Sequence, residues 1–246
     1  MQRLDAPEIL DSETCPAEEV RAALQTLDRI NRCFGGVSTT QKMVERVLAA
    51  WGTRHFSLLE VAAGSGEVPR TVRQRLARKG IRMDVTLLDR VRSHLPQAKL
   101  PQAKPAERNA SSSSARQDGG VVAEALALPF PDEAFDLVSC NLFAHHLSPE
   151  QLAQFVREGL RVGRKAVLIN DLVRHPLHLA LVYASYPIMG SRVAWLDGLT
   201  SVRRAYVPRE IRSVACAASP HTKVEIIRNY LFRMGVIVWK RADLRG

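Results

Sequence analysis

Hydrophobic positions along the chain alternate between two spacings. Short continuous apolar runs, typical of buried strands, occupy residues 55–61, 82–88, 121–123, 135–140 and 165–169. Between them, apolar residues recur at helical spacing over residues 67–79 and 149–161. Continuous apolar strands that alternate with helices are typical of a parallel sheet covered on both faces. The pattern therefore predicts a doubly wound α/β fold.

Before the first strand, the spacing is helical. Apolar positions predict one helix over residues 17–33 and a second over about 40–51, with Gly35 and Gly36 ending the first. Ser38 or Thr39 is expected to cap the second helix. We interpret residues 1–52 as an N-terminal helical extension and residues 53–246 as the main domain.

The end of the chain has strand spacing instead. Residues 223–228 and 231–240 are apolar runs split by a very short connection, which predicts a β-hairpin and an antiparallel edge to the sheet. The fold class predicted is thus α/β and Rossmann-like. It has a doubly wound, mostly parallel sheet, a C-terminal antiparallel hairpin, N-terminal helices and a helical lid.

Two long connections interrupt the alternation. Residues 97–120 are a low-complexity run with Leu100 as their single large apolar residue, and we expect a flexible loop there. Residues 172–207 follow the last parallel strand and carry further helical segments. Because ligands bind beyond the carboxyl ends of the strands in such sheets, we expect this second connection to form a lid over the substrate.

Composition narrows the class of protein. The chain has 246 residues, of which 46% are hydrophobic and 24% charged, as in ordinary globular proteins. Its four cysteines form no C-x-x-C pair, so neither a zinc site nor a disulfide framework is indicated, and a cytoplasmic setting is expected. No apolar run is long enough to span a bilayer, and the N-terminus does not resemble a secretory signal.

A net charge of +10 leaves nucleic acid open as a partner. The arginines are spread along the chain, however, and form neither an RGG tract nor a basic–aromatic strand. Charge alone is a weak signal, so we expect a small-molecule substrate rather than nucleic acid. The sequence carries no signal about the oligomeric state.

The strongest chemical signal lies between the first strand and the helix after it. Residues 58–69 read LLEVAAGSGEVP. Gly64 and Gly66 let the backbone turn sharply and bring its N–H groups close to a ligand, and the N-terminus of the following helix favours an electronegative group. A lone G-x-G is equally compatible with a plain strand–helix turn, so further features are needed.

Those features follow in order along the chain. Asp89 ends the next strand, a little over ~20 residues after the glycines, where nucleotide-binding folds place an acid for the ribose hydroxyls. Glu124 follows the third strand, and residues 130–138, FPDEAFDLV, lead into the fourth. The series EVAAGSGE, LLD and AEALALPFPDEAFDLV resembles motifs I to IV of class I methyltransferases over residues 55–170. It is most similar to the ubiquinone/menaquinone-biosynthesis group and to small bacterial methyltransferases of phenolic polyketides.

This resemblance implies S-adenosyl-L-methionine as the cofactor. It places Glu60 at the methionine amine with Asn141 beside it, Asp89 on the ribose diol and Arg90 along the adenine. The complete implied cofactor set is Glu60, Ala62, Gly64, Ser65, Gly66, Asp89, Arg90, Glu124, Ala125 and Asn141. Two positions depart from the usual motif: Ala62 replaces the first glycine of E/D-x-G-x-G-x-G, and Glu124 stands where Asp is usual.

A nicotinamide-dependent dehydrogenase is the obvious competitor on the same fold. Such an enzyme needs a third glycine in the turn, where this chain has Pro69. The LPFPDEAFD segment is also foreign to dehydrogenases. We therefore favour a methyltransferase.

Substrate contacts are expected from the lid, whose aromatic and soft residues suit a flat apolar molecule. The candidates are Tyr183, Tyr186, Met189, Trp195 and Arg204. His145 and His146 follow the fourth strand, and either is a candidate base for deprotonating a substrate hydroxyl. Nothing resembles H-E-x-x-H or a complete tetrahedral ligand set, so no metal is expected.

The function predicted is methyl transfer from S-adenosyl-L-methionine to a small aromatic, phenolic or quinone-like natural product, with oxygen as the favoured acceptor atom. An RNA or protein methyltransferase is the alternative, supported by the net charge. A cofactor-binding protein without activity is a third possibility, which the intact motifs disfavour.

Overall fold

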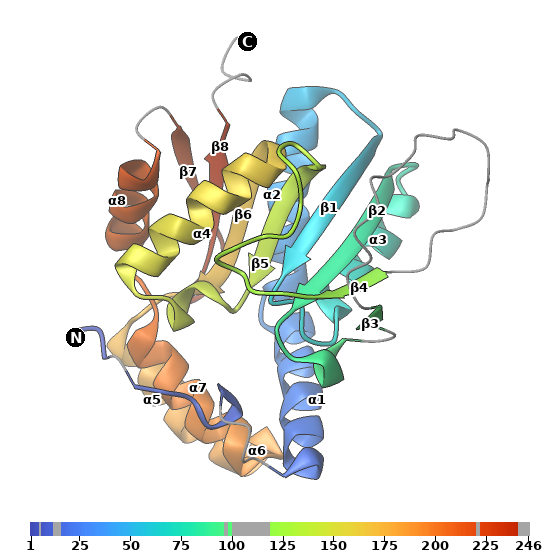
Figure 1. The fold of residues 1–246 in the computed structure, drawn as a ribbon. Helices are drawn as coiled ribbons and strands as arrows, with labels where there is room; N and C mark the ends of the chain where they lie inside the picture. The colour runs from blue at the N-terminus through green and yellow to red at the C-terminus, as the bar shows by residue number, and fades with distance from the viewer. Residues whose placement is uncertain (5, 12–15, 96–97, 100–118, 220–221, 241–246) are drawn as a thin grey trace.

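The computed structural model describes residues 1–4, 6–11, 16–95, 98–99, 119–219 and 222–240. Its centre is an eight-stranded sheet in the order β3-β4-β2-β1-β5-β6-β8-β7 (Figure 1). The strands through β6 pair in parallel and the last two pair antiparallel. The strands are β1 (His55–Val61), β2 (Arg82–Asp89), β3 (Ala98–Lys99), β4 (Gly119–Val122), β5 (Phe135–Asn141), β6 (Gly163–Leu172), β7 (Lys223–Tyr230) and β8 (Arg233–Trp239). The predicted α/β fold with its antiparallel hairpin is confirmed.

Helices cover both faces of the sheet. The α-helices are α1 (Ala17–Cys33), α2 (Gly36–Trp51), α3 (Glu67–Ala77), α4 (Pro149–Val162), α5 (Pro176–Ala184), α6 (Tyr186–Met189), α7 (Arg192–Arg204) and α8 (Pro208–Ala218). Within the described residues, short 3-10 helices are η1 (Ile9–Asp11), η2 (Arg92–His94) and η3 (Ala144–His146). α2 and α3 pack on one face through residues such as Val44 and Leu76, and α4 and α8 pack on the other through Phe155 and Ile211. Each face thus has its own buried apolar core.

The second helix begins earlier than its sequence predicts. α2 starts at Gly36, so the expected caps Ser38 and Thr39 lie inside it. Gly35 has a φ of 83° and serves as the N-cap, a left-handed conformation that glycine adopts without strain. A Cβ at Gly35 would lie 2.4 Å from that of Tyr230. The glycine pair therefore forms a tight turn that lets α2 continue directly from α1.

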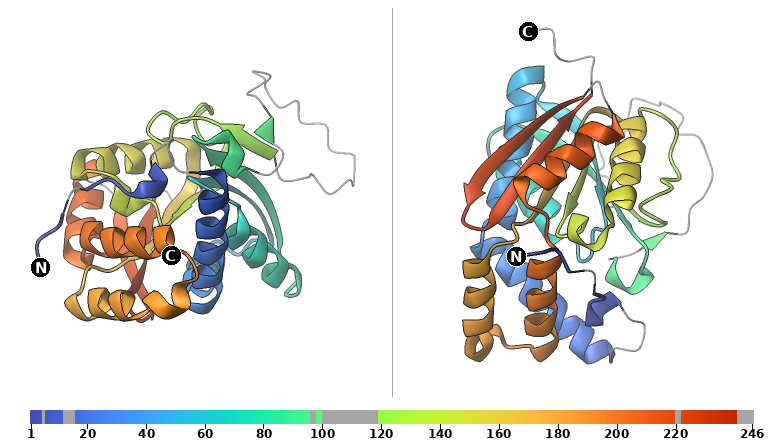
Figure 2. Two further views of the ribbon diagram at one scale, coloured as in Figure 1. Left: turned by 90° about the horizontal axis from the view of Figure 1, so that it is seen from below. Right: turned by 90° about the vertical axis from the view of Figure 1, so that its left-hand side faces the viewer.

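The two long connections that the sequence predicts have different structures. Of the expected loop 97–120, residues 98–99 form β3 and residues 119–120 begin β4. Residues 97 and 100–118 lie outside the described part of the chain. Residues 172–207 carry α5, α6 and α7, which stand below the carboxyl ends of the strands together with α1 (Figures 1 and 2). The division of the chain at residue 52 stays a prediction.

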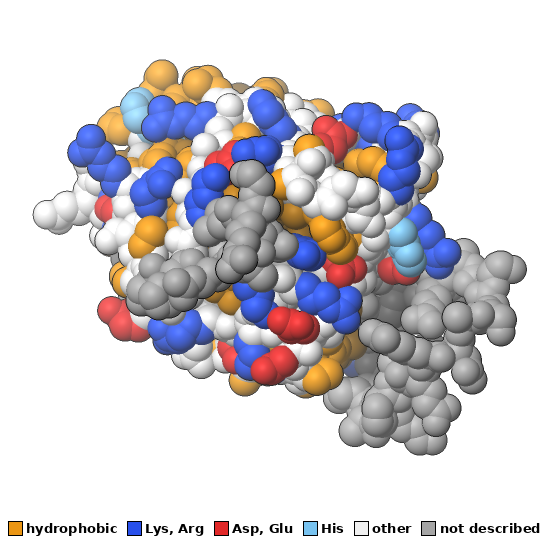
Figure 3. Space-filling model, turned by 90° about the horizontal axis from the view of Figure 1, so that it is seen from above, with side chains coloured by type: hydrophobic (Ala, Val, Ile, Leu, Met, Phe, Trp, Pro, Cys, Tyr) orange, Lys and Arg blue, Asp and Glu red, His pale blue; other side chains and the backbone are white. Residues whose placement is uncertain are grey.

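The opposite end of the molecule is charged. On the face seen from above in Figure 3, arginine and lysine side chains are scattered among acidic and apolar ones.

Among the described helices, none has the length and apolar character needed to cross a membrane.

Close packing of α4 on the sheet provides a stability test. A Cβ at Gly159 would lie 2.7 Å from Cγ2 of Val167, a fully buried side chain of β6. We expect Gly159→Ala to lower the free energy of unfolding by about 1–3 kcal/mol, because an added methyl group overpacks this contact. Urea unfolding measures the change, with Arg157→Ala on the exposed side of the same helix as the control. An unchanged midpoint would mean that α4 can move away from the sheet at little cost.

Candidate active site

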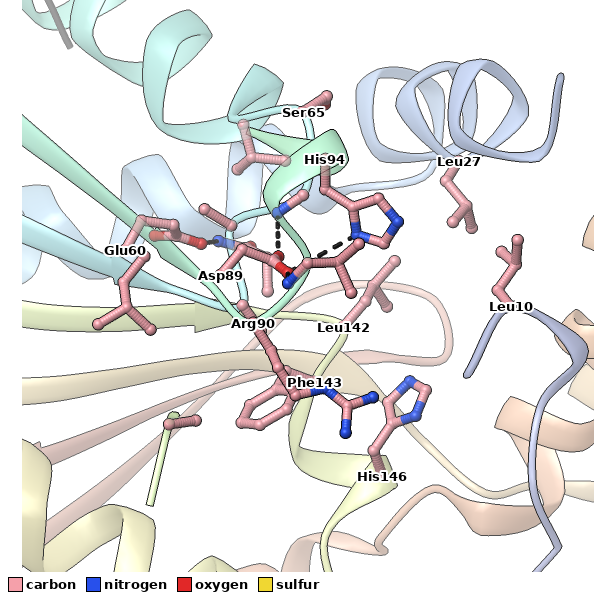
Figure 4. A pocket seen from close by; sticks show the side chains of 18 of the residues that line it. Leu10, Leu27, Glu60, Ser65, Asp89, Arg90, His94, Leu142, Phe143 and His146 are labelled. Atoms are coloured by element: carbon pink, nitrogen blue, oxygen red, sulfur yellow. Dashed lines mark hydrogen bonds and ion pairs between the residues drawn. The ribbon is translucent and has the colours of Figure 1, made fainter. Parts of the chain in front are cut away.

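A cavity of about 430 Å³ opens at the carboxyl ends of the strands. Its size is in the range of small-molecule sites. Figure 4 shows Glu60 and Asp89 on one side, Phe143 and His146 on another, and Leu10 near Leu27 on a third. The walls therefore come from the sheet, from η3, from α1 and from the segment before α1.

The turn between β1 and α3 is built from left-handed residues. Ala62, Gly64 and Gly66 have φ values of 53°, 51° and 71°. A Cβ at Gly66 would lie 2.6 Å from Cδ1 of Leu87, whereas a Cβ at Gly64 would meet nothing within 4 Å. Gly66 is thus needed for packing, and Gly64 leaves open space at the cavity wall. The positive φ of Ala62 explains why glycine is usual at that position.

Asp89, at the end of β2, holds this turn in place. Its Oδ2 accepts the backbone N–H of Gly64 at 2.8 Å, and its Oδ1 accepts that of Val91 at 2.9 Å. The ring Nδ1 of His94 lies 3.6 Å from Oδ1. Burial raises the pKa of Asp89, but its hydrogen bonds with His94, Val91 and Gly64 outweigh burial and hold that pKa below its ordinary value. The cavity therefore contains an ionised carboxylate where the sequence predicts the ribose.

Glu60 lies deeper in the same wall and is buried. Ser139 donates a short hydrogen bond to Oε2, and Nδ2 of Asn141 donates to Oε1 at 2.6 Å. Burial raises the pKa of Glu60 to about 7, although both hydrogen bonds act to lower it. Oδ1 of Asn141 in turn accepts from Thr40 of α2 at 2.7 Å. The carboxylate is thus held by neutral donors and suits a cationic ligand group.

The remaining predicted cofactor residues, except Gly66, also line the cavity. Ser65, Arg90, Glu124 and Ala125 belong to its walls. Oγ of Ser65 donates to Oδ1 of Asp28 on α1 at 2.8 Å. Gly66 does not line the cavity and acts through packing, as described above.

The two candidate histidines have different surroundings. His145 is buried, and its Nδ1 lies 2.7 Å from Oδ1 of Asp171. Burial lowers the pKa of His145, but Asp171 and Glu8 together raise it to about 10. A ring that is protonated at neutral pH cannot accept a proton, and His145 is not among the residues that line the cavity. The structure thus argues against His145 as the base.

His146 does line the cavity, with 22% of its side chain exposed. Its ring is directed toward the cavity in Figure 4 and stacks on Phe143, with centroids 6.3 Å apart and an interplanar angle of 22°. Of the two adjacent histidines, His146 is therefore the one available to a substrate.

The lid residues do not occupy the predicted position. Tyr183, Tyr186, Met189 and Trp195 are not among the cavity-lining residues. Trp195 instead packs against Tyr183 and Tyr186, with centroid separations of 5.7 and 4.8 Å, and its Nε1 donates to the main-chain oxygen of Val182. Both tyrosines are exposed. These aromatic side chains pack between α5, α6 and α7 instead of lining the cavity.

Arg204 is the one residue of the predicted substrate set that lines the cavity. Its Nη1 and Nη2 donate to the main-chain oxygens of Ala6 and His146, both at 2.8 Å. The arginine therefore fixes the backbone around the cavity.

Two walls of the cavity could not be predicted from the sequence. Leu24, Leu27 and Asp28 line it from α1, and Glu8 and Leu10 line it from the preceding segment. The apolar periodicity of residues 17–33 was visible, but that pattern cannot distinguish a helix face packed on a core from one that faces a ligand. Glu8 has no sequence signal beyond being an isolated acid.

Comparisons with known proteins found a family model and solved structures that are similar to this chain. A family model described as a methyltransferase domain matches residues 59–169. The plantazolicin methyltransferase BamL, solved with a triazolic desmethylPZN analogue and SAH, is 10% identical, with 91% of each chain covered and a TM-score of 0.65. No curated protein matches the sequence.

Two further solved structures share the fold at low identity. An O-methyltransferase family 2 protein from Planctomyces limnophilus, solved with apigenin, is 16% identical over 93% of this chain, with a TM-score of 0.51. Human N-acetylserotonin methyltransferase, solved with SAM, is 14% identical over 94% of this chain, with a TM-score of 0.52. The chain covers 63% and 61% of those two proteins, less than two thirds of their length.

Proposed function

We propose that this chain, an S-adenosyl-L-methionine-dependent methyltransferase, methylates a small aromatic, phenolic or quinone-like natural product, with a hydroxyl oxygen as acceptor. The observation that carries this proposal is that the predicted cofactor carboxylates and His146 line one cavity. Phe143, stacked on His146, offers an aromatic surface beside that histidine. Structural neighbours solved with apigenin and with a desmethylPZN analogue support a small-molecule acceptor.

The residues present fit the cofactor. A buried carboxylate held by neutral donors, Glu60, suits the methionine ammonium, with Asn141 beside it. Open space at Gly64 and the ionised Asp89 suit the ribose, and Arg90 and Glu124 border the adenine end. When bound, S-adenosyl-L-methionine supplies an activated methyl group on a sulfonium.

His146 activates the acceptor hydroxyl of the substrate. Its ring takes the proton from the substrate hydroxyl, which makes the oxygen a better nucleophile. His145 remains protonated and anchors η3 to Asp171, whose Oδ2 also accepts the backbone N–H of His145 at 2.8 Å. The walls exclude water and align the reactants, which supplies much of the acceleration for an already activated methyl donor.

Replacement of His146 tests this role. We expect His146→Gln and His146→Ala to lower kcat by ~10²–10⁴-fold, the contribution of a general base. The loss should shrink for more acidic phenols, because they ionise with less help. Turnover of a phenol series is measured across pH, with cofactor affinity as the folding check and His55→Gln, on the exposed end of β1, as the matched control. Wild-type turnover and pH profile in both variants would exclude His146 as the base.

An RNA or protein methyltransferase is the second candidate, favoured by the net charge of +10. Such a substrate needs a basic track beside the methyl donor, and phosphate contacts make binding fall steeply with salt. Salt-dependent binding and methylation of RNA, together with no turnover of any phenol, would replace the small-molecule proposal.

A further inference from the structure

Residues 8–10, which precede α1, are held at the cavity by one face of α7. Asp197, Ser201 and Arg204 lie three and four residues apart, so they share a side of that helix. All three are polar and buried. A helix face of this kind needs polar partners, because a buried polar group without them is costly.

Those partners come from the N-terminal segment. The backbone N–H groups of Ile9 and Leu10 donate to the two carboxylate oxygens of Asp197 at 2.7 and 3.0 Å. Oγ of Ser201 donates to Oε1 of Glu8 at 2.7 Å. Chain termini are ordinarily held loosely. The buried contacts here instead fix Glu8 in one place.

That place is beside both histidines. Oε1 of Glu8 lies 3.4 Å from Nε2 of His145, and Oε2 lies 3.6 Å from Nε2 of His146. Glu8 is 8% exposed and lines the cavity. Burial raises its pKa, but His145, His146 and Ser201 outweigh burial and hold it below the ordinary value. Glu8 is therefore an ionised carboxylate at the end of the cavity where the proposed base lies.

Other charged groups also lie around this carboxylate. Asp171 faces His145 from β6, on the opposite side of its ring from Glu8. Arg204 reaches the same cavity from α7 and donates to the main-chain oxygen of His146. Arg3 donates to the main-chain oxygens of His145 and Leu147. Among the described residues, Glu8 is thus the acid whose carboxylate oxygens lie near both histidine rings.

We propose that Glu8 is a positioning residue for His146, brought to the cavity by the N-terminal segment. This inference rests on the proposed function. When the substrate proton leaves the hydroxyl oxygen and bonds to the ring nitrogen of His146, the ring becomes a cation. Glu8 stays ionised, orients that ring and stabilises its positive charge.

Glu8→Gln tests this role, because it keeps the shape and removes the charge. We expect kcat to fall about tenfold or more, as part of the ~10²–10⁴-fold contributed by a base, with cofactor affinity unchanged. The acidic limb of the pH profile should also move, and Glu8→Asp should retain more activity than Glu8→Gln. Glu19→Gln, on the exposed side of α1, is the matched control.

A second readout does not depend on turnover. In ¹³C-histidine-labelled protein, the pKa of His145, about 10, should fall in Glu8→Gln, since Glu8 helps to raise it. Absence of turnover with every phenol would defeat the proposed function, while this titration still decides whether the Glu8 carboxylate acts on the adjacent ring of His145. An unchanged titration, or wild-type kcat and pH profile in Glu8→Gln, would overturn the inference. Loss of activity on addition of EDTA and its recovery with Zn²⁺ would also overturn the inference. The ligand atoms of Glu8, His145 and His146 lie within 4.8 Å of one another, so these residues would then bind the metal.

Discussion

Asp89→Ala is expected to weaken S-adenosyl-L-methionine binding by about 10²–10⁴-fold. The carboxylate is ionised in the folded protein, and each hydrogen bond to a charged group contributes about 1.5–3 kcal/mol. A ribose diol offers two such bonds. The substitution also removes the acceptor for the Gly64 N–H, so the turn that borders the proposed cofactor site loses a hydrogen bond that holds it in place. Isothermal titration calorimetry with cofactor measures the loss.

Two variants sharpen this experiment. Asp89→Asn keeps the size of the side chain and removes its charge, so an intermediate affinity is expected. Asp84→Ala is a matched control on the same strand, because Asp84 pairs with His55 and Arg82 at the exposed end of β2. Equal affinity in wild type and Asp89→Ala would remove Asp89 from the cofactor site.

The sheet and the wall of the cavity at the β1–α3 turn could be predicted because their determinants are local. Apart from β3, which lies in the expected loop, the strands contain short apolar runs. The turn after β1 needs small residues at left-handed positions, so spacing alone locates Gly64, Gly66 and Asp89. α2 was placed less well. Its start depends on how closely Gly35 approaches Tyr230, a residue almost two hundred positions away in the chain. Such long-range contacts leave no periodic signal.

The substrate end shows the same limit more strongly. The aromatic residues of 172–207 suggested a ligand-facing lid, yet Tyr183, Tyr186 and Trp195 pack on one another outside the cavity. An apolar helix face has the same pattern whether it meets a ligand, another helix or a partner. Glu8 is the converse case. It is one of several acids before α1, and contacts of its segment with Asp197 and Ser201 of α7 fix its position.

Glu60→Gln is expected to weaken cofactor binding by roughly 30- to 4,000-fold. Removing one partner of a buried charge pair costs about 2–5 kcal/mol, and Glu60 is buried among neutral donors that do not replace the lost charge. The wild-type affinity should also depend on pH. Because the ammonium of the cofactor pairs with the ionised form, affinity should rise as pH approaches about 7, the pKa of Glu60, and level off above it. Glu60→Gln should lack this rise.

The raised pKa of Glu60 should destabilise the folded protein at high pH, the range in which cofactor affinity is greatest. The folded protein binds the Glu60 proton more tightly than the unfolded chain, whose pKa is the ordinary 4.5. This contribution to stability is fully present below pH 4.5 and is lost as pH rises through about 7. Glu60→Gln cannot ionise, so without cofactor it should be more stable than wild type above pH 7, by up to about 3 kcal/mol, and equal to it in acid. Urea unfolding across pH measures the difference, with Glu19→Gln as the control. If wild type and Glu60→Gln unfold alike at every pH while cofactor affinity still falls, the carboxylate binds the amine, but burial does not raise its pKa. If affinity is also unchanged, the methionine end of the cofactor lies elsewhere.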